Sequence, residues 1–248
     1  INVQLDIPYT ESGNPRHKLD SYQPQVAGYK HVVVFFHGGS WRSGDKAIYA
    51  GVGRWLASNG IGWVIANYRL HPEVKIDGIM EDAAKVVRWT CENPAVVGGR
   101  PSMIHLMGHS SGAHMAALLA TDESYLHREG LTLGENVRGV VLLSGIYNLG
   151  FAFGLSGTDD AFKGVNRKEY SPYKLVGRDV PPVFVLYAEN DYRTLGGQAQ
   201  DFHKKLVGKG VRSELYMVPK DDHISEIMNL VVPNSPQGQR VLQWIKNH

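Results

Sequence analysis

Short apolar runs alternate with helical patterns along most of the chain, and this alternation constrains the fold more than any other feature. Residues 31–36 read HVVVFF, the continuous apolar run expected of a strand buried on both faces. Further strand-like runs occur at 62–67, 103–107, 138–143, 183–187 and 213–218. Helical patterns occupy 47–59, 77–92, 113–121, 197–207 and 237–246. Because neighbouring parallel strands need crossover connections, this order predicts an α/β fold with a mostly parallel central sheet and helices on both faces.

The two ends of this pattern set the predicted domain organisation. Residues 4–9 and 17–22 read as short strands around the turn-rich Ser12-Gly13-Asn14-Pro15, which predicts an opening antiparallel hairpin. The length of 248 residues fits one domain spanning 1–248. Between residues 147 and 179 the strand–helix rhythm breaks, and we expect an excursion over the sheet edge that shapes a pocket.

Charge and composition exclude several classes of partner. The formal net charge is only +2 and the Lys and Arg residues are scattered, so no nucleic-acid partner is predicted. No run of 18 apolar residues predicts a membrane span. Cys91 is the only cysteine, which favours a reducing cytoplasmic compartment. The chain begins at Ile1 rather than Met, which leaves open a removed leader, and the oligomeric state is not predicted.

One serine stands between a strand pattern and a helix pattern. The pentapeptide Gly108-His109-Ser110-Ser111-Gly112 has the form G-x-S-x-G, the nucleophile elbow. Small residues are needed there because a sharp strand-to-helix turn brings chain segments close together and strains the backbone of the serine. We therefore expect Ser110 to be a nucleophile exposed at the sheet edge.

A serine nucleophile needs a base and a carboxylate that orients the base. Among eleven histidines, His223 is the expected base because it follows the last strand in a loop at the same sheet edge. Asp191 is the expected carboxylate, since it follows the strand at 183–187 and gives the chain order Ser, Asp, His. Glu189 is its rival. Structural or solvent-exposed roles are expected for the other histidines considered: His105, His109, His114, His203 and His248.

The predicted oxyanion donors lie after the first buried strand. Adjacent glycines allow backbone N–H groups to approach a ligand closely, so Gly38 and Gly39 in His37-Gly38-Gly39-Ser40 are expected to donate. The N–H of Ser111, the residue after the nucleophile, is expected to join them. The sequence has no Cys/His cluster with metal-ligand spacing and no phosphate-binding loop, so neither a metal nor an organic cofactor is predicted.

Together, the segments HGGSW, GHSSG, END and DDH resemble the α/β-hydrolase fold, and more narrowly the hormone-sensitive-lipase-like esterases, the small feruloyl and acetyl esterases, and kynurenine formamidase. Residues 67–73 are similar to the family's Tyr-Arg-Leu segment. The likeness extends from about Lys18 to Trp244. Ser40 and Ser111 stand where the family typically has Gly or Ala, and both changes leave the backbone donors available. The long N-terminal cap of larger members is missing from the pattern, which implies an open pocket.

The resemblance implies acyl transfer to water with a small-molecule ester as substrate. Trp41 and Tyr147 are expected to border the pocket and to favour small or aromatic acyl groups. An arylformamidase, which hydrolyses N-formylkynurenine with the same machinery, is the alternative activity. A non-catalytic ligand-binding protein of the same fold is the alternative from another class.

Overall fold

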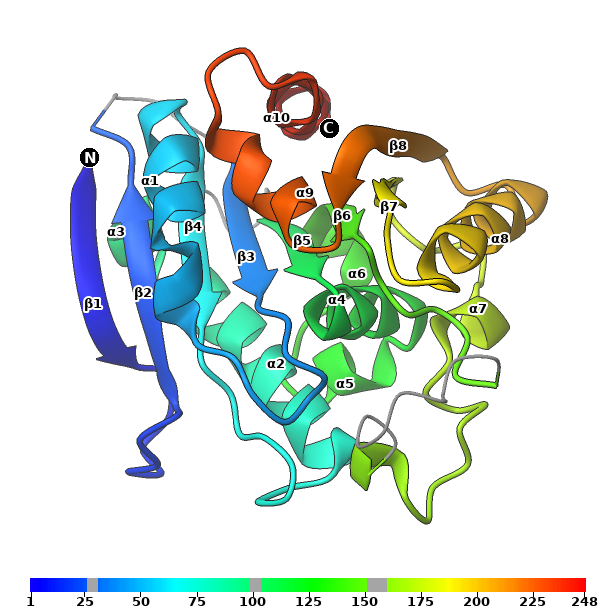
Figure 1. Ribbon diagram of the computed structural model, residues 1–248. Helices are drawn as coiled ribbons and strands as arrows, with labels where there is room; N and C mark the ends of the chain where they lie inside the picture. Colours follow the sequence, from blue (N-terminus) through cyan, green and yellow to red (C-terminus); the bar gives the residue numbers. More distant parts are fainter. Residues whose placement is uncertain (26–30, 99–103, 151–159) are drawn as a thin grey trace.

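A computed structural model describes residues 1–25, 31–98, 104–150 and 160–248. Its centre is one eight-stranded sheet with the strand order β1-β2-β4-β3-β5-β6-β7-β8 (Figure 1). The strands are β1 (Asn2–Pro8), β2 (Lys18–Gln23), β3 (Val32–Phe36), β4 (Gly62–Ala66), β5 (Ile104–His109), β6 (Val137–Leu143), β7 (Val183–Asn190) and β8 (Ser213–Asp222).

The pairing directions confirm the predicted fold class. β1 pairs with β2 in antiparallel fashion, as expected for the opening hairpin, and β2 continues antiparallel to β4. Every pairing from β4 to β8 is parallel. The carboxyl ends of six strands therefore meet at one edge of the sheet, where the loops that follow them can bring together residues distant in sequence.

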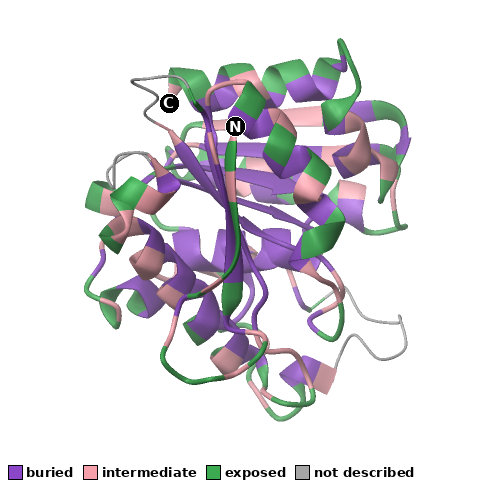
Figure 2. Cartoon of the chain, turned by 90° about the vertical axis from the view of Figure 1, so that its left-hand side faces the viewer, coloured by how far each residue is buried: buried purple, intermediate pink, exposed green. Residues whose placement is uncertain are grey.

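The alternation of side chains along β3 explains why both sheet faces are covered. Val33 and Phe35 belong to the apolar cluster that includes residues of α1 (Ala50–Ser58) and α10 (Pro236–Asn247). Val32, Val34 and Phe36 belong to the other cluster, formed with α2 (Ile76–Glu92), α4 (Ser111–Thr121) and α8 (Leu195–Gly208). Figure 2 shows the result, a sheet that is mostly buried apart from its edge strand β1 and that lies between helices whose outer faces are exposed. All five residues of β3 are fully buried because successive side chains point to opposite faces.

Shorter elements complete the described chain. The α-helical turns are α3 (Pro94–Val97), α5 (Ser124–His127), α6 (Leu133–Asn136), α7 (Pro172–Leu175) and α9 (Ser225–Met228). Three 3₁₀ turns are η1 (Lys46–Tyr49), η3 (Asp160–Phe162) and η4 (Asn229–Val231). In the described ranges, no helix is both long and apolar enough to cross a lipid bilayer.

In the described parts of the segment 147–179, which are 147–150 and 160–179, the regular elements are the short η3 and α7. Within its described part, Phe162 packs edge-on against Trp41 at a ring separation of 4.8 Å, and the Tyr170 carbonyl contacts the His114 Nε2 at 2.8 Å. These contacts fix the segment under the loop that follows β3. Residues 151–159 lie outside the described residues, so the pocket-shaping role of the segment stays a prediction, as does the single domain over 1–248.

Candidate active site

Four loops at the carboxyl edge of the sheet carry the residues singled out from the sequence. Ser110 follows β5, Asp191 follows β7 and His223 follows β8, while Gly38 and Gly39 follow β3. Strand pairing fixes these loops side by side, since β5 lies next to β3 on one side and β6 on the other, and β7 pairs with β8. The structure therefore brings together residues that are up to 185 positions apart, from Gly38 to His223.

The turn at Ser110 has the strained geometry of a nucleophile elbow. Its φ of 57° and ψ of −122° lie outside the regions that a serine ordinarily adopts. The two flanking glycines are required by close approach. A Cβ on Gly108 would lie 2.2 Å from the Gly112 carbonyl oxygen, and one on Gly112 would lie 2.0 Å from that of Phe36. The turn thus presents the Ser110 hydroxyl at the start of α4.

Ser110, His223 and Asp191 form a continuous hydrogen-bonded line. The His223 Nε2 lies 2.9 Å from the Ser110 Oγ, and its Nδ1 lies 2.7 Å from the Asp191 Oδ1. The Asp191 side chain is only 3% exposed. Burial alone would raise the pKa of Asp191, but hydrogen bonds from His223 and Ser144 outweigh it and lower the pKa below its ordinary value. Asp191 is thus ionised at neutral pH and can hold His223 with Nε2 free to accept the serine proton.

The backbone donors near Ser110 differ in part from those expected. The N–H of Gly38, an expected oxyanion donor, donates to the Tyr49 hydroxyl at 3.2 Å in this structure, so its role at the oxyanion stays a prediction. Among the described residues, the N–H groups of Gly39, Ser40 and Ser111 donate to no protein acceptor. Ser40, which was not among the expected donors, offers a further N–H beside Ser110.

Gly39 must be a glycine for a separate reason. Its φ is 130°, and a Cβ there would lie 2.2 Å from the Ser43 carbonyl oxygen. The next two residues also have positive φ, 54° at Ser40 and 58° at Trp41. This run of unusual backbone angles turns the chain after β3 and leaves the free N–H groups beside the nucleophile loop.

His109 connects the elbow to two other loops of the site. Its Nε2–H donates to the His223 carbonyl oxygen at 2.7 Å, and its Nδ1 lies 3.3 Å from the Tyr49 hydroxyl, which accepts from Gly38. Burial, with a smaller effect of His223, lowers the pKa of His109 to about 3. The ring is therefore neutral, and Nδ1 accepts from the Tyr49 O–H. Sequence reasoning assigned His109 a structural role, and the structure shows the contacts that make up this role.

Two further side chains lie behind Asp191, and sequence reasoning missed both. The Ser144 hydroxyl, in the loop after β6, is hydrogen-bonded to the Asp191 Oδ2 and to the Glu226 Oε2. Glu226, in α9, is fully buried. Burial, together with the nearby carboxylates of Asp191 and Asp221, raises the pKa of Glu226 well above its ordinary value. Glu189, the rival to Asp191, is exposed instead and accepts from the Lys220 N–H at 2.7 Å.

A cavity of about 340 Å³ opens over Ser110 and His223. Its lining is mostly backbone and apolar side chains, with no Lys, Arg, Asp or Glu among the described residues that border it. The apolar part comes from Ile48, Tyr49, Tyr192, Ile224, Ile227 and Met228. Tyr192 lies over the base, with its ring centroid 4.4 Å from that of His223.

The structure corrects the predicted pocket residues. Trp41 is 1% exposed and packs edge-on against His114 and Phe162, while Tyr147 is fully buried and stacks on Phe202 at 4.4 Å. Neither side chain lines the cavity at Ser110. Both residues lie close in sequence to strand ends, but at these positions the side chains point into the core between the sheet and its helices. Tyr192 and the apolar residues of η1 and α9 occupy the rim instead.

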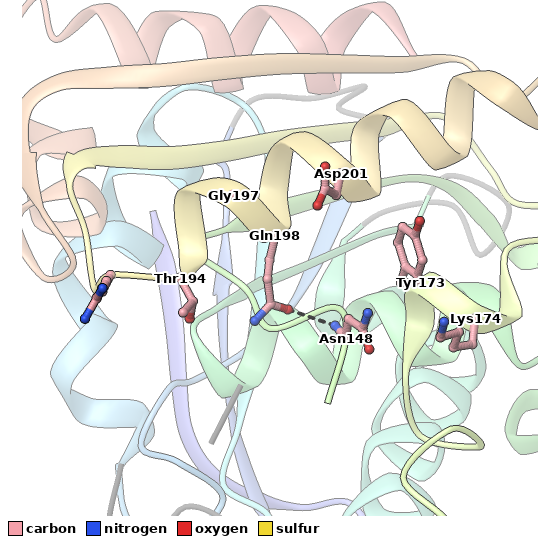
Figure 3. A pocket seen from close by; sticks show the side chains of 8 residues that line it. Asn148, Tyr173, Lys174, Thr194, Gly197, Gln198 and Asp201 are labelled. Carbon is pink, nitrogen blue, oxygen red and sulfur yellow. Dashed lines mark hydrogen bonds between the residues drawn. The ribbon is translucent and has the colours of Figure 1, made fainter. Parts of the chain in front are cut away.

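A second cavity of about 510 Å³ lies beside α8 and contains none of the predicted site residues (Figure 3). Gln198 forms one wall, and its Oε1 accepts from the backbone N–H groups of Tyr147 and Asn148 at 2.9 and 2.8 Å. This amide therefore fixes the start of the 147–179 segment against α8. In the part of the chain that the structure describes, no group of three His, Cys, Asp or Glu side chains could hold a metal ion.

Two curated relatives are similar along most of the chain. Isoprenylcysteine alpha-carbonyl methylesterase ICME of Arabidopsis thaliana is 27% identical over 242 residues, which cover 89% of this chain and 56% of that protein. Kynurenine formamidase of Danio rerio is 27% identical over 251 residues, or 97% of this chain and 81% of that protein. The chain thus spans about half the length of the plant methylesterase.

Solved structures identify the fold and a family model identifies the family. A truncated carbohydrate esterase from gut microbiota superposes with a TM-score of 0.85 at 19% identity, covering 100% of this chain and 96% of that one. Esterase B from Lactobacillus rhamnosis gives 0.84 at 21% identity, covering 99% and 86%. The fold is that of the α/β-hydrolases, as the sequence predicted. The BD-FAE family model matches residues 19–150, more than half of the sequence. The chain therefore belongs to the BD-FAE family.

Proposed function

We propose that the protein is a serine hydrolase that cleaves small or aryl carboxylic esters through an acyl-enzyme intermediate. The observation that carries the proposal is the line of hydrogen bonds from Ser110 through His223 to Asp191 at the base of an apolar cavity. The esterase names among the relatives and among the proteins of similar fold support the same reaction class.

The geometry supports a two-step acyl transfer. The Ser110 Oγ attacks the ester carbonyl carbon while His223 accepts its proton at Nε2, and Asp191 stabilises the imidazolium that forms. The N–H groups of Gly39, Ser40 and Ser111 stabilise the oxyanion of the tetrahedral intermediate. His223 then protonates the leaving alcohol, and water repeats the sequence to release the acid. The activity is expected to fall as the pH is lowered, because a protonated His223 cannot accept the serine proton.

The cavity favours neutral esters over the alternative substrate. N-formylkynurenine carries an amino-acid ammonium and carboxylate, which would need charged or strongly polar partners in a buried site. No such charged side chain lines the cavity among the described residues. The similarity to kynurenine formamidase nevertheless keeps formamide hydrolysis as the second candidate. Rates on N-formylkynurenine and on p-nitrophenyl acetate and butyrate distinguish the two, and a preference for the formamide would overturn the ester assignment.

The first test removes the nucleophile. Ser110→Ala is expected to lower kcat on p-nitrophenyl acetate by about 10⁴-fold or more, as is typical when a serine nucleophile is lost. A serine-directed phosphonate should label Ser110 in the parent protein and leave the variant unlabelled. The matched control is Ser58→Ala, which alters an exposed serine at the end of α1 and should retain full activity.

Undiminished turnover by Ser110→Ala would exclude the proposed mechanism. Ligand binding by the parent protein without turnover of any ester or formamide would favour the non-catalytic role instead. Unfolding curves of the two variants serve as a check that loss of activity is not loss of fold.

A further inference from the structure

The Ser144 hydroxyl lies between two carboxyl groups, Asp191 and Glu226, and contacts one oxygen of each. A serine hydroxyl has one proton and can donate it to only one acceptor. If Asp191 and Glu226 were both ionised, one of the two contacts would bring two oxygens together with no proton between them. Hydrogen bonds on both sides of the Ser144 hydroxyl therefore require one additional proton in the group of three side chains.

Asp191 does not hold this proton, because its oxygens already receive several donors. The Oδ1 accepts from the His223 Nδ1–H at 2.7 Å and from the Tyr192 N–H at 2.7 Å, and the Oδ2 faces the Ser144 hydroxyl. These hydrogen bonds favour the ionised form of the Asp191 carboxylate. A protonated Asp191 would lose at least one of them.

The surroundings of Glu226 favour the neutral acid. The side chain is fully buried in α9, and among the described residues it has no ion-pair partner. Among the described residues, the titratable groups that face it are Asp191, Asp221 and the neutral phenol of Tyr147, and none of them is a cation that would compensate a charge on Glu226. Asp221 is itself occupied, since Asn229 and Gln237 donate to its two oxygens at 2.7 and 2.8 Å. The unpartnered Glu226 Oε1 is a carbonyl oxygen in this form, which costs less to bury than a carboxylate oxygen.

We propose that Glu226 is a positioning residue that, as a neutral carboxylic acid, donates its proton to the Ser144 Oγ and so directs the Ser144 proton to the Asp191 Oδ2. The inference rests on the proposed hydrolase function for its catalytic consequence. A donor fixed on Oδ2 keeps Asp191 ionised and leaves Oδ1 for His223, which sets the orientation of the imidazole toward Ser110. An ionised Glu226 would instead compete with Asp191 for the Ser144 proton.

The first experiment compares pH profiles of kcat/KM on p-nitrophenyl acetate for the parent protein and Glu226→Gln. The glutamine amide still donates to Ser144 and carries no charge, so the midpoint of the acidic limb is expected to move by less than about 0.3 unit. If Glu226 were ionised, the substitution would remove an anion near His223 and shift the midpoint down by about one unit or more, which would overturn the proposal. Glu189→Gln is the matched control, because Glu189 is an exposed carboxylate near the end of β7, the strand that Asp191 follows.

A second variant tests donation itself. Glu226→Leu keeps a side chain of similar size but cannot donate to Ser144, and kcat is expected to fall about 10-fold relative to Glu226→Gln. Ser144→Ala removes the connection altogether and is expected to lower kcat by about 10- to 100-fold. Equal rates for the leucine and glutamine variants would overturn the positioning role.

An infrared measurement tests the proton without any substrate. At pH 8 the exposed Asp and Glu side chains are ionised, so the difference spectrum between the parent protein and Glu226→Gln is expected to contain the carbonyl stretch of one protonated carboxyl group. Absence of that band would overturn the proposal even if the leucine variant failed to fold. Absence of ester hydrolysis in the parent protein would count against the proposed function, whereas the infrared result would still decide the protonation of Glu226.

Discussion

At the residue scale, the site depends on side chains that hold other groups in place. Tyr49 accepts from the Gly38 N–H and donates to His109, which in turn donates to the His223 carbonyl oxygen. These bonds join the loop after β3, the elbow and the loop after β8. Each donor in this series of hydrogen bonds has one acceptor. Removal of the Tyr49 hydroxyl or of the His109 ring therefore leaves a buried polar group without a partner.

The substitution Tyr49→Phe tests this series of hydrogen bonds, because it removes only the hydroxyl. The Gly38 N–H is buried and would lose its acceptor, so the free energy of unfolding is expected to fall by about 1–3 kcal/mol. We also expect kcat to fall, because the loop that carries the Gly39 and Ser40 donors loses a restraint. Tyr22→Phe is the control, since the Tyr22 hydroxyl has no hydrogen bond among the described residues. Urea unfolding and ester kinetics measure both effects, and equal stability losses in the two variants would contradict the assigned role of Tyr49.

The sequence could predict Ser110, Asp191 and His223 but not the residues behind them. The three follow strand ends in an order typical of this fold, so local pattern and chain order are sufficient. Ser144 and Glu226 are 82 positions apart and meet Asp191 only because β6, β7 and β8 are neighbours in the sheet. Nothing in the local sequence of either residue specifies that contact, and Tyr49 reads equally well as an apolar helix residue.

At the scale of elements, tertiary pairing extends the last two strands beyond their apolar runs. The sequence predicts strands at 183–187 and 213–218, whereas β7 ends at Asn190 and β8 at Asp222. Asn190 pairs with Asp222 beyond a shift in register after Ala188. Such bulges change the direction of the side chains that follow, and here they precede Asp191 and His223. The bounds of the five longer helices, α1, α2, α4, α8 and α10, were predictable to within a few residues.

The elbow shows how close packing of β5, α4 and β3 restricts the sequence. Gly112→Ala would place a Cβ 2.0 Å from the Phe36 carbonyl oxygen, and backbone cannot move aside as a flexible side chain can. The free energy of unfolding is expected to fall by about 2 kcal/mol or more. Gly51→Ala in α1 is the matched control, because a Cβ there meets no atom within 4 Å. The free energy of unfolding of Gly51→Ala is expected to rise by roughly 0.5–1 kcal/mol, because alanine has a higher helix propensity than glycine. Both variants are measured by urea unfolding, and a loss of stability in Gly51→Ala would contradict this account.

At the scale of the whole molecule, four histidines are buried as neutral rings. Desolvation lowers the pKa of His37 and His114 to about 4 and that of His105 and His109 to about 3. In the unfolded chain each would titrate near pH 6.5. Because the folded pKa values are depressed, their contribution to stability is present above about pH 6.5 and is lost as the pH falls toward the folded values.

Unfolding at pH 5.5 is therefore expected to take up protons. The four histidines would bind nearly one proton each, and Glu226, whose pKa is raised in the folded state, would release about one, for a net uptake of about three. The measurement is the pH dependence of the free energy of unfolding, checked by calorimetry in buffers of different ionisation enthalpy. Stability that stays constant between pH 7 and 5 would contradict the neutral burial of these rings.

The overall architecture was predictable because alternating apolar runs and helical stripes leave few ways to cover both faces of a parallel sheet. The orientation of single side chains was not. Trp41 and Tyr147 lie near strand ends, as the cavity residues do, yet both turn into the core, and only the packed structure decides between these two directions.

Both chain ends lie at the edge of the sheet opposite the candidate site (Figure 1). Asn2 pairs with Gln23, near the start of β4, and His248 stacks on Trp244, whose ring contacts His105 early in β5. A surface tether or a fused carrier protein joined at either end would thus extend away from the cavity over Ser110. In a flow reactor or on a display scaffold, attachment at Ile1 or His248 would leave the cavity facing the solution.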